Sequence, residues 1–448
     1  MKKIRFLVAM LAFTAFATSI AVAEDISEER KPIVYLLAVD EGSEPVPTSQ
    51  AEEAMMNREA VECAKIKFKE HYRTGFQQVQ PPTIMFTDRN NKFSIGIGGY
   101  IAMRVGYDFK GSPSSTDFIP YDISVPSNSL DQTGLAMDLT TSRLFVKALF
   151  NTRTLGTVEV FIDGDYRGGS EGNYRPRVRS AYVSMKGLLF GRDFTTFCDL
   201  DAGPRTIDFQ GPNAYNANFA TMLRYVYTCA NDHLTLGIAA EYPQLSGAYG
   251  SDYEAVTQRV PDFPMYAQYE WGEERKSHFR ASAVLRNPYM YSNITDEATS
   301  IFAWGTQASG RISTSWFDIL FNGVYGKGIG QYIQDLTGAG LDFTPYPNGS
   351  SQLQATPMWG VQGSIAWKMT ERIEMNGGYS TVSVDSENGG YYYGDSGYKR
   401  GQYVFGNVFC DITPRFNIGA EYLYGCRKNV GGESSQANRV NVLMQYSF

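Results

Sequence analysis

The chain has 448 residues, with 44 glycines, 30 Tyr, 27 Phe and 5 Trp, and only 19% of its residues are charged. This composition favours many β-strands and argues against a helical solenoid, a coiled coil or a disordered chain. The mean hydropathy is -0.29, and no apolar run of about 18 residues follows the N-terminal region, which excludes transmembrane helices. A formal net charge of -7 gives no overall basic footprint, so nucleic acid is not expected as a partner.

Residues 1–23 are expected to be a signal peptide. Three basic side chains near the start precede an apolar stretch, residues 6–16, that is too short to cross a bilayer. Ala21-Val22-Ala23 then supplies the small-x-small pattern of a cleavage site before Glu24. The first residue after that site is Glu24 and not a cysteine, so a lipoprotein is excluded. The exported chain is free in the periplasm, secreted, or built into an outer membrane.

Residues 24–91 are expected to form a periplasmic N-terminal segment with one helix and a proline-containing linker. Ser49 begins a capping-box pattern, and apolar residues recur near helical spacing over residues 51–72. The helix should end near Gly75, and Pro81-Pro82 marks a stiff linker. A helix this short, with one apolar stripe, packs on the domain, pairs with copies of itself in a trimer, or remains a solvated spacer. The sequence leaves these alternatives open.

From residue 92 to residue 448 the pattern has a period of two. Residues 93–109 alternate between apolar and polar or small side chains, and about 9 to 11 tilted residues are enough for a strand to cross a bilayer. Further segments with this pattern are residues 139–151, 157–167, 175–185, 188–194, 219–229, 233–242, 260–271, 277–287, 299–312, 315–328, 356–369, 372–384, 401–411, 416–427 and 438–448. The total of 16 strands is even, as bacterial outer-membrane barrels require.

The connections between these segments alternate between short and long, with seven short turns and eight long loops. This is the count for antiparallel strands with short periplasmic turns, long outer loops and both termini in the periplasm. We therefore predict an all-β fold, a 16-stranded antiparallel transmembrane β-barrel over residues 92–448, preceded by a short periplasmic helical segment. A secreted β-sandwich or β-helix would leave loops of about 20 residues unexplained. A plugged 22-stranded transporter is not expected, because the residues before Phe93 are too few for its plug.

The last predicted strand alternates apolar and polar residues and ends on Phe448. A terminal aromatic residue is the form in which outer-membrane barrels present their final strand to the barrel assembly machinery. We therefore expect the protein in the outer membrane of a Gram-negative bacterium, in contact with lipid.

Motifs of enzymes are missing from the sequence. It has three histidines, His71, His233 and His278, and no G-x-S-x-G, H-E-x-x-H, Walker or dinucleotide-binding pattern. We therefore predict no catalytic residues, no metal and no cofactor, and expect the histidines at solvated turns. The five cysteines lack C-x-x-C spacing, and their odd number cannot pair fully within one chain. Cys229 and Cys410 are expected to act as small apolar side chains, the alternative being a bridge or a reactive thiol.

Charged residues on the inward face of the strands are the candidate pore lining, because lipid would cost about 2 to 4 kcal/mol for each arginine at mid-depth. The candidates are Arg143, Arg167, Arg175, Arg177, Arg179, Arg224, Arg280, Arg286, Glu159, Asp163 and Asp165, with Arg104 and Lys147 also at inward positions. Arg175, Arg177 and Arg179 alternate without an acid on the same face of their segment, which predicts a positive rung that attracts anions at the constriction. In the alternative, these arginines pair with acids of the lumen and of the loops.

The connection over residues 195–218 is expected to fold into the lumen and form the constriction. It carries Asp199, Asp201, Arg205 and Asp208 among aromatic residues, and two Gly-Pro pairs make it rigid. Asp199 and Asp201 form a D-x-D pattern with no third ligand in place, which is a weak signal for a cation site.

Several stretches of the sequence resemble the DcaP-like outer-membrane porin family. They are EVFIDGDY at 159–166, RSAY at 179–182, LFGRDFTTF at 189–197, TIDFQGP at 206–212 and the ending GAEYLYG at 419–425 with the terminal Phe448. The sequence departs from the family at Phe194, where Trp is usual, and at Cys198. The resemblance covers residues from about 93 to the C-terminus. It implies a 16-stranded trimeric porin, general or dicarboxylate-type, with an N-terminal periplasmic helical segment.

These observations predict a passive outer-membrane channel for small hydrophilic solutes, with a preference for small anions such as dicarboxylates. Self-association as a homotrimer is expected from the barrel class and from the resemblance. The alternative from a different class is an outer-membrane enzyme or adhesin that uses the same barrel.

Overall fold

A closed β-barrel forms most of the computed structural model, which describes residues 33–37, 50–71, 75–111, 117–127, 133–169, 173–229, 231–245, 252–345, 353–385 and 394–448. The predicted signal peptide, residues 1–23, lies outside the described residues.

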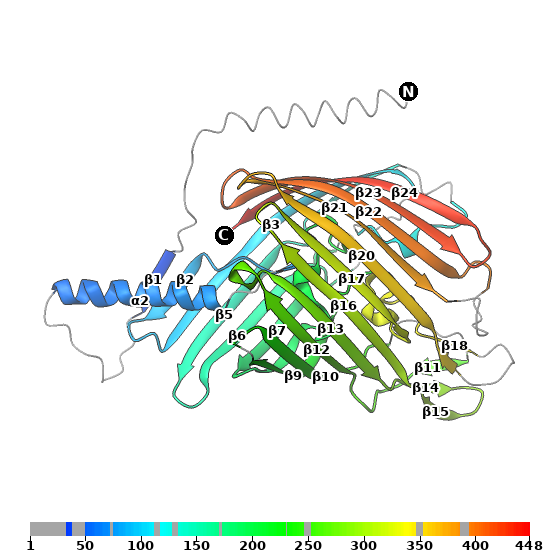
Figure 1. Ribbon diagram of the computed structural model, residues 1–448, viewed down its shortest axis with the longest axis horizontal. Coiled ribbons are helices and arrows are strands. Elements are labelled where there is room, and N and C mark those ends of the chain that lie inside the picture. Colours follow the sequence, from blue (N-terminus) through cyan, green and yellow to red (C-terminus); the bar gives the residue numbers. More distant parts are fainter. Residues whose placement is uncertain are drawn as a thin grey trace, which may run out of the picture.

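The barrel wall follows the chain order (Figure 1). β3 (Phe93–Lys110) pairs with β4 (Gly134–Asp138) and β5 (Arg143–Thr152), which occupy one wall position together. The wall continues through β6 (Gly156–Asp165), β7 (Arg177–Met185), β8 (Leu188–Phe194), β9 (Phe219–Cys229), β10 (Leu234–Glu241), β12 (Phe263–Trp271), β13 (Ser277–Arg286), β16 (Ala303–Ser313), β17 (Phe317–Lys327), β20 (Pro357–Lys368), β21 (Ile373–Val384), β22 (Tyr398–Asp411), β23 (Phe416–Asn429) and β24 (Ser434–Ser447). β24 pairs antiparallel with β3 and closes the barrel. The predicted 16-stranded antiparallel barrel is thereby confirmed.

Alternation along the strands separates apolar from charged side chains across the wall. The exposed residues are apolar, such as Ile101 on β3, Leu144 on β5 and Ile162 on β6. Charged residues between them, such as Arg104 and Asp163, are buried on the inward face. Because a slip of one residue would place such charges in lipid at about 2 to 4 kcal/mol for each arginine, this pattern sets the register of the wall.

Differences from the predicted strand boundaries occur at the long loops. β7 begins at Arg177 and not at Arg175, because the intervening Pro176 has no N–H to donate to the ladder. β22 and β24 begin earlier than predicted, at Tyr398 and Ser434. There the strands continue past the apolar pattern, so hydrophobicity alone could not mark their start.

The N-terminal segment joins the end of the barrel where the short turns lie. It contains the predicted helix, α2 (Gln50–Glu70), and two short strands. β1 (Ile33–Leu37) pairs parallel with β2 (Ile84–Asp88), and β2 pairs antiparallel with the first residues of β3. In Figure 1, α2 extends outward beside β1 and β2, close to the C-terminus of the chain. No helix in the described ranges is both long enough and apolar enough to span a membrane.

The apolar stripe of α2 packs on the domain at its C-terminal half. Ala60, Ala64 and Phe68 are spaced by four residues and are buried. Phe68 contacts Met85 on β2 and Leu149 on β5. Of the three alternatives for this helix, the described residues therefore show packing on the domain.

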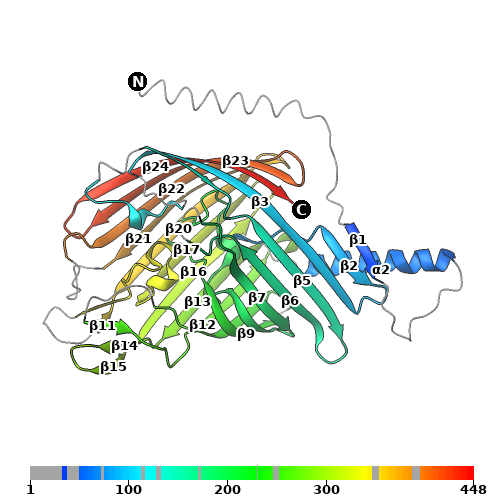
Figure 2. The same cartoon turned by 180° about the vertical axis from the view of Figure 1, so that it is seen from behind.

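Small elements lie at the opposite end of the barrel (Figure 2). β11 (Tyr253–Ala255), β14 (Tyr289–Ser292) and β15 (Glu297–Ser300) form one sheet, and β18 (Phe343–Pro345) pairs with β19 (Leu353–Ala355). The 3-10 helices are in the connections of the whole barrel: η1 (Pro120–Asp122) follows β3, η2 (Leu200–Ala202) follows β8, η3 (Glu273–Arg275) lies in the short turn between β12 and β13, and η4 (Gly330–Tyr332) and η5 (Gln334–Leu336) follow β17.

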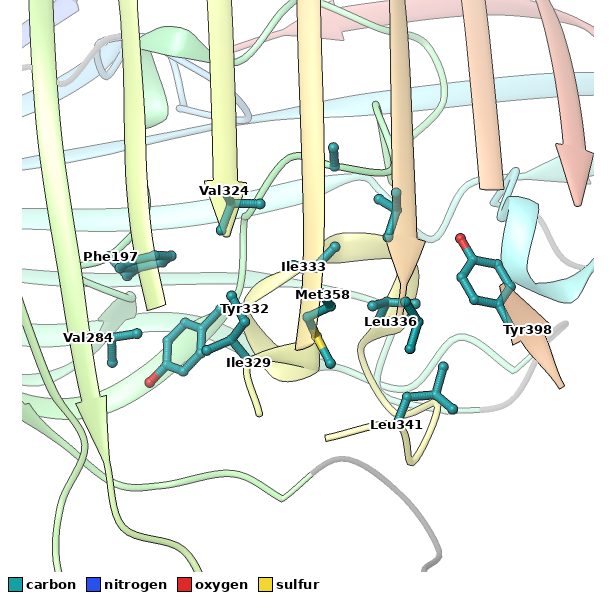
Figure 3. Close-up of a cluster of buried hydrophobic side chains, with 13 residues drawn as sticks. Phe197, Val284, Val324, Ile329, Tyr332, Ile333, Leu336, Leu341, Met358 and Tyr398 are labelled. Atoms are coloured by element: carbon teal, nitrogen blue, oxygen red, sulfur yellow. The ribbon is translucent and has the colours of Figure 1, made fainter. Parts of the chain in front are cut away.

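Two long connections fold inward and pack against each other. Figure 3 shows the apolar cluster between them and the wall. The cluster joins Phe197 from the loop after β8 with residues of the loop after β17 and with wall residues: Ile329, Tyr332, Ile333, Leu336, Leu341, Val284, Val324 and Met358. Burial of each large apolar side chain contributes about 1.5 to 3 kcal/mol, so both loops are held firmly inside the barrel.

Candidate functional site

The loop over residues 195–218, here named the crossing loop, spans the lumen from β8 to the strands on the far side. The N–H groups of Ile207 and Asp208 donate to the carboxylate of Glu421 on β23, at 2.9 and 2.7 Å. The N–H of Ala214 donates to Oγ of Ser380 on β21 at 2.9 Å. Since β21 and β23 lie across the barrel from β8, the structure places this loop in the lumen, as the sequence predicted.

Buried polar residues of the wall fix the start of the crossing loop. Glu241 on β10 accepts hydrogen bonds from Oγ1 of Thr195 and from the N–H of Thr196, both at 2.6 Å. Asp199 accepts from Nε2 of His278 at 2.9 Å and from Oγ of Ser309 at 2.6 Å. Burial opposes ionisation of Asp199, but these hydrogen bonds and the nearby charges hold its pKa below the usual value. Asp199 is therefore an anchor of the loop.

The solvated position predicted for His278 is wrong. This residue is buried on β13 because Asp199 is its partner across the lumen. His71 and His233 lie at the end of a helix and in a turn, where each ring contacts a backbone carbonyl. In the described ranges no group of three His, Cys, Asp or Glu residues could hold a metal ion. The five cysteines, all described, are free thiols.

A β-bulge in β7 directs two consecutive side chains inward. Asp163 on β6 pairs with Ser180, while the next residue, Gly164, pairs with Val178. Arg179 is the extra residue between them, and both Arg179 and Ser180 are buried. Strict alternation cannot place Arg177, Arg179 and Tyr182 on one face. The bulge shifts the alternation by one residue, so the side chains of all three residues face the lumen.

The arginines of this region pair with the acids of β6. Arg143 binds the carboxylate of Asp163, and Nη1 of Arg179 lies 3.2 Å from Asp165. Arg177 donates from Nε to the same Asp165 at 2.9 Å. The face of β7 has no acids of its own, and the neighbouring strand β6 supplies them. This agrees with the alternative interpretation of the sequence, in which the arginines pair with acids of the lumen.

Arg175 does not take part in this row. It precedes β7, and its side chain is exposed. Pro176, between Arg175 and Arg177, ends the hydrogen-bond ladder of the strand. The alternation that predicted three arginines on one face therefore does not reach Arg175. The row is limited to Arg177 and Arg179.

Most other predicted lumen charges also have partners. Arg167 pairs with Asp117, Arg104 with Asp138, and Arg224 with Asp193. Glu159 accepts a hydrogen bond from Tyr182 at 2.7 Å and lies 3.3 Å from Lys147. Arg280 stacks on the ring of Tyr266 and donates to the backbone carbonyl of Thr196, so it supports the crossing loop.

Arg286 serves the structure of the wall and does not line open space. Its side chain is fully buried and lies 2.9 Å from Asp262 and 3.6 Å from Asp342. It also donates to the carbonyl oxygens of Gly328 and Gln244. This residue ties the inward loop after β17 to the wall.

An open cavity of about 460 Å³ lies between the crossing loop and the short turns of the barrel. Its lining includes Asp201, Arg205 and Asp208 of the crossing loop and the wall charges Arg104, Arg311, Asp318, Glu374 and Asp411. Arg205 stacks on Phe409 at 3.9 Å and lies 3.9 Å from Glu374. This cavity is the candidate solute path on the periplasmic side of the loop.

Asp208 at the tip of the crossing loop has an unusual environment. Burial, with the nearby carboxylates of Asp117 and Glu421, raises the pKa of Asp208 to about 7. Its carboxylate accepts hydrogen bonds from the N–H of Phe118 at 3.1 Å and from the hydroxyl of Tyr403 at 3.0 Å. The carboxyl group of Asp208 therefore loses its proton at a higher pH than an ordinary aspartate.

Glu421 and Glu241 were missed by sequence reasoning as loop anchors. Glu421 occupies an inward position in the predicted strand, so alternation could have singled it out, whereas nothing local indicates its partner more than 200 residues away. Gln77, from the N-terminal segment, contacts Arg143 and Arg179. No pattern in the sequence indicated that this residue lies in the lumen.

The family model of the DcaP outer membrane protein matches residues 86–334, more than half of the chain. The chain belongs to this family. Among solved structures, the outer membrane channel DcaP of Acinetobacter baumannii is similar with a TM-score of 0.70 at 18% identity, covering 80% of this chain and 97% of that chain. Salmonella typhi OmpF in complex with daunomycin reaches 0.50 at 11% identity, covering 80% and 99%. A loop-deletion mutant of Vibrio cholerae OmpT reaches 0.50 at 12%, covering 80% and 100%.

At these identities the solved structures support the fold alone, and the comparison with curated proteins found no match. Family membership places the chain in the outer membrane of a Gram-negative bacterium. With the porin-type barrel, it makes this DcaP-family protein an outer-membrane channel and not an enzyme.

Proposed function

We propose that this protein is a passive diffusion channel for small hydrophilic solutes that prefers anions, including small dicarboxylates. The supporting observation is that, in several ion pairs of the lumen, the basic partner is the more exposed one. In the pair of Arg177 and Asp165, the arginine side chain is 35% exposed and the carboxylate is fully buried. Asp318 is 5% exposed, while its partners Arg311 and Lys368 are 25% and 36% exposed. A permeating solute therefore meets the positive partner first.

An ion pair still contributes an electrostatic field to the lumen when its basic partner is more exposed to water than its acidic partner. The same order holds for Arg224 with Asp193 and for Arg167 with Asp117, where the arginine is again the more exposed partner. Selectivity is decided by the charges that line the narrow part of the pore, so it can oppose the sign of the net charge of the chain.

The expected preference is moderate, because acids also reach the cavity. Glu374, Asp201 and Asp411 contribute to its lining. Arg205 and Arg311 line the same cavity from the crossing loop and from the wall. A solute with two carboxylates can be attracted at both places in turn without a tight, dehydrating site, which supports the proposal for dicarboxylates.

The test is the double variant R177Q/R311Q, with Arg175→Gln as the matched control outside the strand. Reversal potentials across a planar bilayer under a salt gradient give the anion-to-cation permeability ratio. We expect the ratio to fall at least about twofold in the double variant, because two water-facing cations are lost. An equal ratio in the parent and the double variant, or an equal fall in the control, would contradict the proposal.

We further propose that the chain assembles as a homotrimer and is inserted by the barrel assembly machinery. All five Trp residues lie between β12 and β20: Trp271, Trp304, Trp316, Trp359 and Trp367. Tryptophan is enriched at membrane–water interfaces, so this half of the wall is expected to face lipid. The opposite half has no Trp and exposes Leu135, Met137 and Met444 together with Tyr and Phe side chains, and is the expected subunit contact.

The C-terminal Phe448 completes the wall by exchanging two backbone hydrogen bonds with Gly99, both at 3.0 Å. A last strand that closes the barrel in this way fits recognition by the assembly machinery. Native mass measurement in mild detergent tests the trimer, and one chain per particle would refute it. Loss of outer-membrane insertion on deletion of Phe448 tests the assembly signal.

A further inference from the structure

Residues 75–80, here named the strap, lie inside the barrel although they precede it in the sequence. The N–H of Phe76 donates to the carbonyl of Leu200 at 2.7 Å, and its ring packs edge-on against Tyr215 at 4.9 Å. Gly75 has φ +105, and a Cβ there would lie 2.5 Å from the oxygen of Leu200. A Cβ on Gly203 would likewise lie 2.5 Å from Phe76. These close approaches fit the strap to the crossing loop.

A second apolar residue fixes the strap to the wall. Val79 is buried in a cluster with Phe145 on β5, Phe161 on β6 and Tyr182 on β7. Phe76 and Val79 thus attach the strap to the loop and to the wall. The polar residues between and after them, Gln77, Gln78 and Gln80, line the 460 Å³ cavity. The strap therefore presents a row of amides to the solute path.

Gln77 connects the strap with three other elements. Its backbone carbonyl accepts a hydrogen bond from Arg143 on β5, and its Oε1 accepts one from Nη2 of Arg179 at 2.6 Å. Its Nε2 donates to the carbonyl of Phe209 in the crossing loop. The backbone of Gln77 has φ 54, a region that a residue with a side chain seldom adopts unless its surroundings hold it.

From these contacts we infer that Gln77 is a specificity-determining residue of the pore, contributed by a segment that precedes the barrel strands in the sequence. The strap narrows the periplasmic cavity, and Gln77 occupies hydrogen-bonding positions of Arg143 and Arg179 that would otherwise meet a permeating anion. This inference deepens the proposed channel function and rests on it. Release of the strap should widen the path and expose these two arginines.

Charge variants at Gln77 test the inference in the full-length protein. In Q77K the new ammonium group lies beside two guanidinium groups, so like-charge repulsion should release the strap. We expect single-channel conductance to rise at least about 1.5-fold, since a pore lining segment is displaced. In Q77E the carboxylate loses the hydrogen bond to the carbonyl of Phe209 but gains a charge contact with Arg179. The strap should therefore stay in place, and the added negative charge should lower the anion-to-cation ratio.

Gln80→Lys is the matched control, because it adds the same charge to the same cavity from an exposed position of the strap. Equal conductance in the parent and Q77K, or an equal rise in Q80K, would overturn the inference. Heat-modifiable mobility in gels shows which variants form the barrel. If Q77K does not, Q77A and Q77E decide: parental conductance in Q77A together with an unchanged ion ratio in Q77E would overturn it.

These readouts separate the strap from the proposed selectivity. A cation-preferring parent protein would contradict the anion proposal. The rise in conductance of Q77K over Q80K measures the strap directly and does not depend on the sign of that preference.

Discussion

Glu421 on β23 accepts a hydrogen bond from the backbone N–H of Asp208 at 2.7 Å. This contact, with its neighbour from Ile207, ties the tip of the crossing loop to the far wall of the barrel. The carboxylates of the two residues lie in the same buried region, and Glu421 contributes to the raised pKa of Asp208. Glu421 thus anchors the crossing loop and also favours the protonated form of Asp208.

Replacement of Glu421 should release the loop tip. E421A removes an acceptor of two backbone hydrogen bonds, and hydrogen bonds to charged groups contribute about 1.5 to 3 kcal/mol each. We expect a larger and noisier single-channel conductance than in the parent. E270A removes a partly exposed, inward carboxylate of β12 that accepts a hydrogen bond from Gln268 and serves as the control. A quiet, parental conductance in E421A would show that the loop does not depend on this anchor.

Lower pH should increase the anion preference through Asp208. Because its pKa is raised to about 7, Asp208 is largely ionised at about pH 8 and largely protonated at about pH 5.5. Protonation removes a negative charge from the pore region, so the anion-to-cation ratio should rise as pH falls through about 7. D208N should lose this part of the dependence. An identical pH profile in the parent and D208N would exclude Asp208 as its source.

The raised pKa also gives the sign of the stability change. The unfolded chain releases this proton near its ordinary pKa of about 3.9, before the folded chain does. Between about pH 4 and about pH 7 the folded state therefore binds more protons, and its stability decreases as pH rises. The unfolding temperature, measured as the temperature at which the barrel loses its folded mobility in gels, should depend less on pH in D208N than in the parent over that window.

Arg286 should affect stability and not selectivity. R286Q leaves Asp262 and Asp342 buried without this partner, and breaking a buried pair costs about 3 to 5 kcal/mol. We expect a clearly lower unfolding temperature in the gel mobility assay and an unchanged reversal potential. Arg275→Gln breaks an exposed pair with Asp232 and is the control. A shifted reversal potential in R286Q would return this residue to the pore lining.

The barrel was predictable because lipid imposes a strict rule on each strand separately. Ile101 and Arg104 have to face opposite sides of β3, and this shows in any window of the sequence. The inward position of the crossing loop was also predictable, from its charged and aromatic residues and its Gly-Pro pairs. The conformations of the loops depend on distant partners, such as Asp199 with His278, which no local pattern connects.

The charge pattern of the site was only partly predictable. The arginines of β7 suggested an unpaired row, but pairing with Asp163 and Asp165 depends on the register of two strands and on a bulge at Arg179. The strap was hidden for another reason. Proline residues after Gln80 favour an extended linker. The local sequence of such a linker does not distinguish a position in solvent from a position in the lumen.

The zero-current potential of the parent protein measures the sign of the ion preference of the pore. The purified full-length channel is placed in a planar bilayer between concentrated and dilute potassium chloride at neutral pH. An anion-preferring pore lets chloride pass to the dilute side, so we expect a negative potential on that side. A positive potential there, which means that potassium passes more easily, would contradict the proposed anion preference.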